Sequence, residues 1–208
     1  MSAQESVILL HGLWMGPWVM GWISHHLMSE GYAVRALSLN SMSDSPDAHV
    51  DRLAKAVEEA ECQRVHLLGH SLGGVVSLRY LQEREHVRVG RCLLMGVPAL
   101  GCQAARQLDL QPWGALLGTS RELWFSPFAP SVPEDIEVGA IAGNHAFGLG
   151  PLFTHLDGPS DGVVTIDETR IAGLKDHIVL EVSHTAMLFS TEVANQAAAF
   201  LKRGSFQR

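Results

Sequence analysis

The 208-residue chain is 47% hydrophobic and 18% charged, and its formal net charge is −7 at pH 7. This length and apolar fraction suit one sizeable hydrophobic core, so we expect a single domain spanning residues 1–208. The acidic balance, without any long run of Lys or Arg, argues against a nucleic-acid partner. The three cysteines form no Cys-x-x-Cys pair and leave an odd count, which argues against a disulfide framework or a zinc site.

The amino-terminal residues show no pattern typical of a secretory signal or a membrane span. Residues 1–5 carry no basic cluster, and the apolar stretch that follows is interrupted by His11, Gly12, Gly16 and Pro17. A signal peptide requires an unbroken apolar segment, and a membrane-spanning helix requires about 20 apolar residues. We therefore expect a cytoplasmic protein that does not insert stably into membranes.

Residues 7–97 alternate between strand-like and helix-like hydrophobic patterns. In chain order, the patterns predict a strand at 7–10, a helix at 14–30, a strand at 32–39, a helix at 48–61, a strand beginning at 65, a helix reaching 83 and a strand at 90–97. Such alternation is typical of a parallel sheet that helices cover on both faces. The sequence therefore predicts the α/β class, as a three-layer α/β/α sandwich with a mostly parallel central sheet.

The second half of the chain continues the sheet after a less regular connection. Residues 101–131 predict one helix near 104–108, and the segment leaves little room for a separate cap domain, so we expect none. The patterns then predict a strand at 136–142, a glycine-rich loop at 143–162, a strand at 177–182 and a helix at 191–202, for which Thr191 is a candidate N-cap. We expect the irregular connection to overhang the strand ends.

A Gly-x-Ser-x-Gly motif at residues 69–73 lies between a predicted strand and a predicted helix. This arrangement is typical of a nucleophile elbow, in which the serine, here Ser71, occupies a strained turn that exposes its hydroxyl. Side chains at positions 69 and 73 would collide in so sharp a turn, and glycine removes them. The helix that follows directs its unpaired N–H groups toward Ser71, where negative charge gathers during acyl transfer.

A serine nucleophile needs a base, and the base needs a carboxylate that orients it. The histidines that follow the motif are His145, His155, His177 and His184. We favour His184, because it comes directly after the predicted strand at 177–182, at the edge where reactive groups collect in such folds. His177 lies at the opposite end of that strand.

Two aspartates in the predicted loop at 143–162 are candidates for the acid. Asp157 and Asp161 each precede a glycine, and both come between Ser71 and His184, as the chain order of hydrolases with this elbow requires. An aspartate before glycine is often only a turn former. Loop order alone therefore leaves both candidates open.

The tetrahedral intermediate of acyl transfer needs donors for its oxyanion, and backbone N–H groups usually supply them. We expect one donor from Leu72, the residue after Ser71. The second is expected from Leu13, in the loop after the first strand, where Gly12 lets the backbone turn. His11 begins this loop, and we expect it to support the loop by hydrogen bonds rather than to transfer a proton.

Several aromatic residues are placed where they could line an acyl pocket. They follow the oxyanion loop or lie in the irregular connection: Trp14, Trp113, Trp124, Phe125 and Phe128. Of these we assign Trp14, Trp124 and Phe125 as candidate substrate-binding residues, with packing in the core as an equal alternative. Trp18 and Trp22 recur near helical spacing, which predicts that they belong to the core.

Together these pieces resemble the α/β-hydrolase superfamily. The matching segments are residues 11–12 after the first strand, 69–74 at the elbow, 161–164 in the long loop and 183–184 after the last strand. Within the superfamily, the chain resembles small bacterial lipases and carboxylesterases that lack a cap domain. The resemblance favours Asp161 over Asp157 as the acid, and it implies a catalytic triad of Ser71, Asp161 and His184.

The same resemblance implies a serine hydrolase that cleaves carboxylic esters through an acyl-enzyme intermediate on Ser71. Its partner would be a small-molecule acyl ester, and no metal or cofactor would be required. A thioesterase or an acyltransferase would use the same three residues, so both are alternatives. A non-catalytic binding protein that keeps the fold is a further alternative.

Overall fold

The computed structural model describes residues 5–125, 132–147 and 156–208, and these residues build a six-stranded sheet. The strands are β1 (Glu5–Leu10), β2 (Ala33–Leu37), β3 (Arg64–His70), β4 (Val89–Met95), β5 (Glu137–Gly143) and β6 (Asp176–Leu180). Their spatial order is β2-β1-β3-β4-β5-β6, and every neighbouring pair is parallel. The predicted α/β class with a parallel sheet is confirmed.

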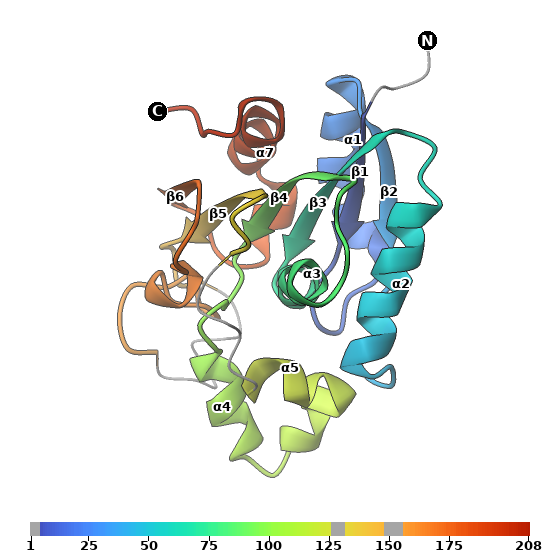
Figure 1. Cartoon of the computed structure of the whole chain (residues 1–208). Coiled ribbons are helices and arrows are strands. Elements are labelled where there is room, and N and C mark those ends of the chain that lie inside the picture. The colour runs from blue at the N-terminus through green and yellow to red at the C-terminus, as the bar shows by residue number, and fades with distance from the viewer. Residues whose placement is uncertain (1–4, 126–131, 148–155) are drawn as a thin grey trace.

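Helices cover both faces of this sheet. Helices α1 (Gly21–Ser29) and α7 (Thr191–Arg203) lie on one face, and α2 (Pro46–Glu58) and α3 (Leu72–Glu83) lie on the other (Figure 1). Side chains of β1 alternate between the two resulting cores: Ile8 and Leu10 face α2 and α3, whereas Val7 and Leu9 face α1 and α7. Because both faces of the sheet centre are buried, β1 and β4 contain continuous apolar runs, whereas the edge strand β2 is partly exposed.

The connection between β4 and β5 forms a group of short helices beyond the sheet. The group contains α4 (Gln103–Asp109), the 3₁₀ helix η2 (Gly114–Ser120) and α5 (Arg121–Phe125). Figure 1 shows α4 and α5 at the opposite end of the molecule from α7. In the part of the chain that the structure describes, these short helices form no separate cap domain, as predicted. No helix within the described ranges is both long and apolar enough to cross a lipid bilayer.

Two short 3₁₀ helices complete the carboxyl-terminal third. They are η3 (Asp167–Thr169) and η4 (Ala186–Phe189), and η4 is followed directly by α7. The predicted N-cap of α7 is wrong by one residue. Thr191 is already helical, and the Ser190 hydroxyl accepts the hydrogen bond from the Val193 N–H at 3.3 Å. Val193 is the third residue after Ser190, and an N-cap side chain accepts its hydrogen bond from the second or third residue of the helix.

The prediction that Trp18 and Trp22 belong to the core is also wrong. The segment starts with the 3₁₀ helix η1 (Pro17–Met20) and becomes α-helical only in α1. A 3₁₀ helix has three residues per turn instead of 3.6, so the buried face changes phase along the segment. Val19 and Met20 are buried instead, while Trp18 is 78% exposed and Trp22 is 44% exposed.

Candidate active site

Ser71 lies in the sharp turn between β3 and α3. Its backbone angles, φ 52° and ψ −121°, belong to a region that non-glycine residues rarely adopt, at a cost of about 1–3 kcal/mol. A Cβ atom on Gly69 would lie 2.4 Å from the backbone of Gly74, and one on Gly73 would lie 2.3 Å from the Leu10 carbonyl oxygen. The predicted steric need for glycine on both sides of Ser71 is therefore confirmed.

Asp161 and His184 form a buried pair in the loops that follow β5 and β6. Nδ1 of His184 donates to Oδ2 of Asp161 at 2.8 Å, and the His184 backbone N–H donates to the Asp161 carbonyl at 2.9 Å. The other carboxylate oxygen, Oδ1, accepts the N–H groups of Val163 and Val164 at 2.9 and 2.7 Å. Since an ionised carboxylate only accepts, Nδ1 carries the hydrogen and Nε2 of the neutral imidazole keeps its lone pair.

The second aspartate of this loop has a different environment. Asp157 is exposed, and its backbone N–H donates to the side-chain oxygen of Gln103 at 3.2 Å. Loop order in the sequence leaves the two aspartates equivalent, whereas the structure brings Asp161 to His184.

The other candidate histidines lie elsewhere. His177 is near the start of β6, where its Nε2 is 2.8 Å from the Thr169 hydroxyl. His145 is exposed in the loop after β5. His155 lies outside the described residues.

His70 and Gly96 contact the Asp161–His184 pair, although neither stood out in the sequence. The His70 ring is fully buried, and its Nε2–H donates to the His184 carbonyl at 3.0 Å. Burial, and next the neighbouring His184 imidazole, lower the pKa of His70 to about 3, so this ring stays neutral at physiological pH. A Cβ atom on Gly96 would lie 3.0 Å from both Oδ2 of Asp161 and Nδ1 of His184. A glycine directly after the apolar run of β4 is the sequence feature that could have indicated this close approach.

The loop after β1 approaches Ser71 closely. A Cβ atom on Gly12 would lie 3.1 Å from Nδ1 of His70 and 3.2 Å from the Ser71 Cβ, so a side chain here would be tightly crowded. Leu13 follows in this loop, and Leu72 is the first residue of α3, where N–H groups have no partner within the helix. The structure thus places both expected oxyanion donors on segments that flank Ser71.

His11 supports the loop after β1 through both of its ring nitrogens. Its Nδ1–H donates to the Gly12 carbonyl at 2.9 Å, and its Nε2 accepts the Leu39 N–H at 3.0 Å. Burial lowers the pKa of His11, with a smaller opposing effect from its bond to Gly12. Because the neutral ring satisfies both bonds, the geometry agrees with the predicted supporting role.

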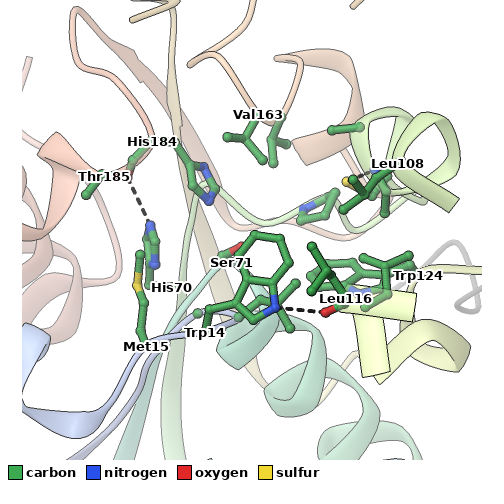
Figure 2. A pocket seen from close by; sticks show the side chains of 18 of the residues that line it. Trp14, Met15, His70, Ser71, Leu108, Leu116, Trp124, Val163, His184 and Thr185 are labelled. Atoms are coloured by element: carbon green, nitrogen blue, oxygen red, sulfur yellow. Dashed lines mark hydrogen bonds between the residues drawn. The ribbon is translucent and has the colours of Figure 1, made fainter. Parts of the chain in front are cut away.

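Ser71 and His184 line a common cavity of about 610 Å³ (Figure 2). Its walls come from the loop after β1, the helices between β4 and β5, and the loops of the acid and base. The lining residues are Gly12, Leu13, Trp14, Met15, His70, Ser71, Pro98, Cys102, Ala104, Ala105, Leu108, Trp113, Leu116, Leu117, Trp124, Phe147, Val163, Val164, His184 and Thr185. No Asp, Glu, Lys or Arg is among these described residues, so the cavity suits an uncharged, apolar ligand group.

The candidate aromatic residues divide between the cavity and its surroundings. Trp14, Trp113 and Trp124 contribute to its wall. Phe125 does not belong to the lining: its ring packs against the core beside α2 and α3, and the Arg121 guanidinium lies 5.4 Å above the ring centre. Neighbouring residues of α5 point in different directions, which accounts for the split between Trp124 and Phe125. Phe128 lies outside the described residues.

Within the described ranges, no group of three His, Cys, Asp or Glu side chains is placed to hold a metal ion. Cys102 contributes to the cavity wall, and burial raises the pKa of its thiol to about 12. It is therefore a neutral thiol at physiological pH.

The fold and this arrangement define the class of protein. Residues 7–201 match the model of the alpha/beta hydrolase family, so the chain belongs to that family. Its fold is similar to that of the mature lipase BlEst2 from Bacillus licheniformis, with a TM-score of 0.79 and 19% identity over 97% of this chain and 92% of that one. It is also similar to an esterase from Exiguobacterium antarcticum, with a TM-score of 0.71 and 14% identity over 97% and 93% of the two chains.

A curated relative from Escherichia coli is 31% identical over 137 residues. It is a 2-hydroxy-6-oxononadienedioate/2-hydroxy-6-oxononatrienedioate hydrolase, and the match covers 53% of this chain and 46% of the relative. The matched region therefore spans about half the length of the curated relative.

Proposed function

We propose that this protein is a serine hydrolase that cleaves carboxylic esters of small molecules. Ser71 Oγ attacks the ester carbonyl, while Nε2 of His184 takes the hydroxyl proton and then returns it to the leaving alcohol. Water then repeats the sequence and releases the acid. Asp161 holds His184 in the required tautomer, and the N–H groups of Leu13 and Leu72 bind the oxyanion.

The observation that carries this proposal is the buried bond between Asp161 Oδ2 and His184 Nδ1, at a cavity that also contains the strained Ser71. The bond directs the basic nitrogen of His184 away from Asp161. The strained backbone of Ser71 costs folding free energy, and residues with such strain cluster at active sites. The two features together are what acyl transfer to a serine requires.

The lining of the cavity favours a neutral ester over a charged substrate. The name of the curated relative describes a dioate, which carries two carboxylates. Burying two carboxylates has a high cost in free energy that cationic side chains usually offset, and no Lys or Arg is among the described lining residues. Carbon–carbon bond hydrolysis of such a dianion therefore has less support here than hydrolysis of an apolar ester. The lipase and esterase that share the fold agree with this choice.

Replacement of Ser71 tests the proposal. Ser71→Ala should lower kcat/KM for p-nitrophenyl butyrate by about 10⁴-fold or more, because the nucleophile is removed. A fluorophosphonate probe should label the wild-type protein and leave Ser71→Ala unlabelled. Ser43→Ala, at an exposed position in the same protein, should keep full activity. Wild-type activity in folded Ser71→Ala would overturn the proposal.

Assays of the reaction products, together with the probe labelling, separate the alternative functions. Labelled protein that releases free acid from an ester, and not from an acyl-CoA, is an esterase. Transfer of the acyl group to an added alcohol would instead identify an acyltransferase. Folded wild-type protein that neither hydrolyses esters nor reacts with the probe would be a binding protein.

A further inference from the structure

Trp14 has a strained backbone immediately beside the expected oxyanion donor. Its φ of 60° is positive, and among the described residues Ser71 is the other non-glycine residue with a positive φ. Bulky residues are rare in this conformation, because Cβ crowds the backbone. The Trp14 N–H donates to the Ser41 hydroxyl at 3.2 Å, which helps to hold the turn. The chain thus keeps a tryptophan at a position that favours glycine.

The strained turn directs the indole across the cavity. The indole Nε1–H donates to the Leu116 carbonyl at 2.8 Å, and the two residues are 102 positions apart in the chain. Figure 2 shows the indole extending from the Ser71 side toward Leu116. Trp14 belongs to the loop after β1, whereas Leu116 belongs to η2, so the bond joins two separate segments of the cavity lining.

The segment that receives this bond is itself fixed. Gly118, with φ 56°, passes so close to the 40–44 loop that a Cβ atom would lie 2.7 Å from the Met42 carbonyl oxygen. The Thr119 hydroxyl donates to the Asp44 carbonyl at 2.6 Å. Ser41, which holds the backbone of Trp14, belongs to the same 40–44 loop. Both ends of the indole bridge therefore contact one loop.

We propose that Trp14 determines substrate specificity by narrowing this cavity to unbranched apolar acyl groups. The inference rests on the proposed ester hydrolysis at Ser71 and deepens it. The large indole is held by its bond to Leu116, so turning it aside for a branched or cyclic acyl group would break that bond. A slender alkyl chain passes the indole and reaches the apolar lining at Leu108 and Trp124. Neutral esters of straight-chain acids are therefore the preferred class.

Acyl preference in variants tests this role. Trp14→Ala removes the wall, and the ratio of kcat/KM for p-nitrophenyl pivalate to that for p-nitrophenyl butyrate should rise by about tenfold, the scale of discrimination for small apolar groups. Trp14→Phe keeps an aromatic ring without the donor and should give an intermediate ratio. Trp18→Ala is the matched control, because Trp18 is exposed and outside the cavity lining. Its ratio should equal that of the wild type.

A binding measurement separates failure of this inference from failure of the proposed function. In the Ser71→Ala background, calorimetry compares the Kd of ethyl hexanoate with that of ethyl 2-ethylhexanoate. Adding Trp14→Ala should tighten binding of the branched ester about tenfold relative to the straight one, whether or not the wild type hydrolyses esters. Unchanged selectivity in both the kinetic and the binding ratios, with active wild-type enzyme, would overturn the role of Trp14 alone. Altered binding selectivity with an inactive wild type would support the role of Trp14 and contradict ester hydrolysis.

Discussion

The His70 side chain donates a hydrogen bond from Nε2 to the backbone carbonyl of His184, 3.0 Å away. His70 is the residue directly before Ser71, so this bond links the turn that carries the proposed nucleophile to the loop that carries the proposed base. The His184 N–H is held from the other side by the Asp161 carbonyl at 2.9 Å. The backbone of His184 is thus fixed at both of its polar groups.

Loss of this donor should misplace the base. We expect His70→Leu to lower kcat by about 10- to 100-fold, the scale of penalty for a small misalignment of reacting groups, while KM changes less. His70→Gln retains an N–H donor and should restore most of the rate. Steady-state kinetics with thermal unfolding of each variant measures both effects. Equal activities of folded His70→Leu and His70→Gln would show that the hydrogen bond does not position His184.

The two aspartates of the loop after β5 provide a matched pair of variants. Asp161→Asn removes the charge that stabilises protonated His184 and can favour the wrong tautomer, so kcat should fall by about 10⁴-fold. Asp157→Asn changes an exposed side chain in the same loop and should leave kcat within about twofold. Fluorophosphonate labelling rates should follow the same order. A large loss in Asp157→Asn alone would instead identify Asp157 as the acid.

Substitution of Gly96 tests how tightly the Asp161–His184 pair is packed. A methyl group at Gly96 would lie 3.0 Å from atoms of both residues, and φ there is +56°. Gly96→Ala should therefore reduce kcat at least tenfold and lower the free energy of unfolding by about 1–2 kcal/mol. Gly31→Ala has a similar backbone cost, with φ +94° and no neighbour within 4 Å of the added atom, so it should lose stability without losing activity. Full activity in Gly96→Ala would contradict the expected crowding.

His49 makes the stability dependent on pH. It is fully buried in α2, and within the described part of the chain neither ring nitrogen has a hydrogen-bond partner. Burial is the main cause that lowers its pKa below 6.5, the value of an unperturbed histidine. Between the lowered pKa and about pH 6.5 the unfolded chain binds more protons, so the stability contribution is complete above that pH and is lost as the pH falls.

His49→Met should therefore increase the free energy of unfolding, because it removes an unsatisfied buried polar group, by about 1 kcal/mol at pH 8. The advantage over the wild type should grow at pH 5, where the variant no longer has this proton uptake on unfolding. Thermal unfolding at both pH values measures the difference. His25→Met, at an exposed position of α1, is the control and should show neither effect. A stability advantage that shrinks toward pH 5 would contradict the expected loss of wild-type stability through His49 at low pH.

The sequence by itself determined the features that depend on neighbouring residues. Strand and helix alternation, the turn at Ser71 and its flanking glycines are local patterns, because hydrophobic period and steric demand act within a few residues. The order of Ser71, Asp161 and His184 along the chain is likewise read directly, and the structure then brings Asp161 to His184.

Only the tertiary structure decided the relationships that depend on packing between distant segments. The bond from His70 to His184 spans 114 positions, and the bond from Trp14 to Leu116 spans 102. The choice between Asp157 and Asp161 likewise follows from how the loops pack at the end of the sheet. Local periodicity carries no information about these contacts, because they arise only when the parallel strands align their carboxyl ends along one edge.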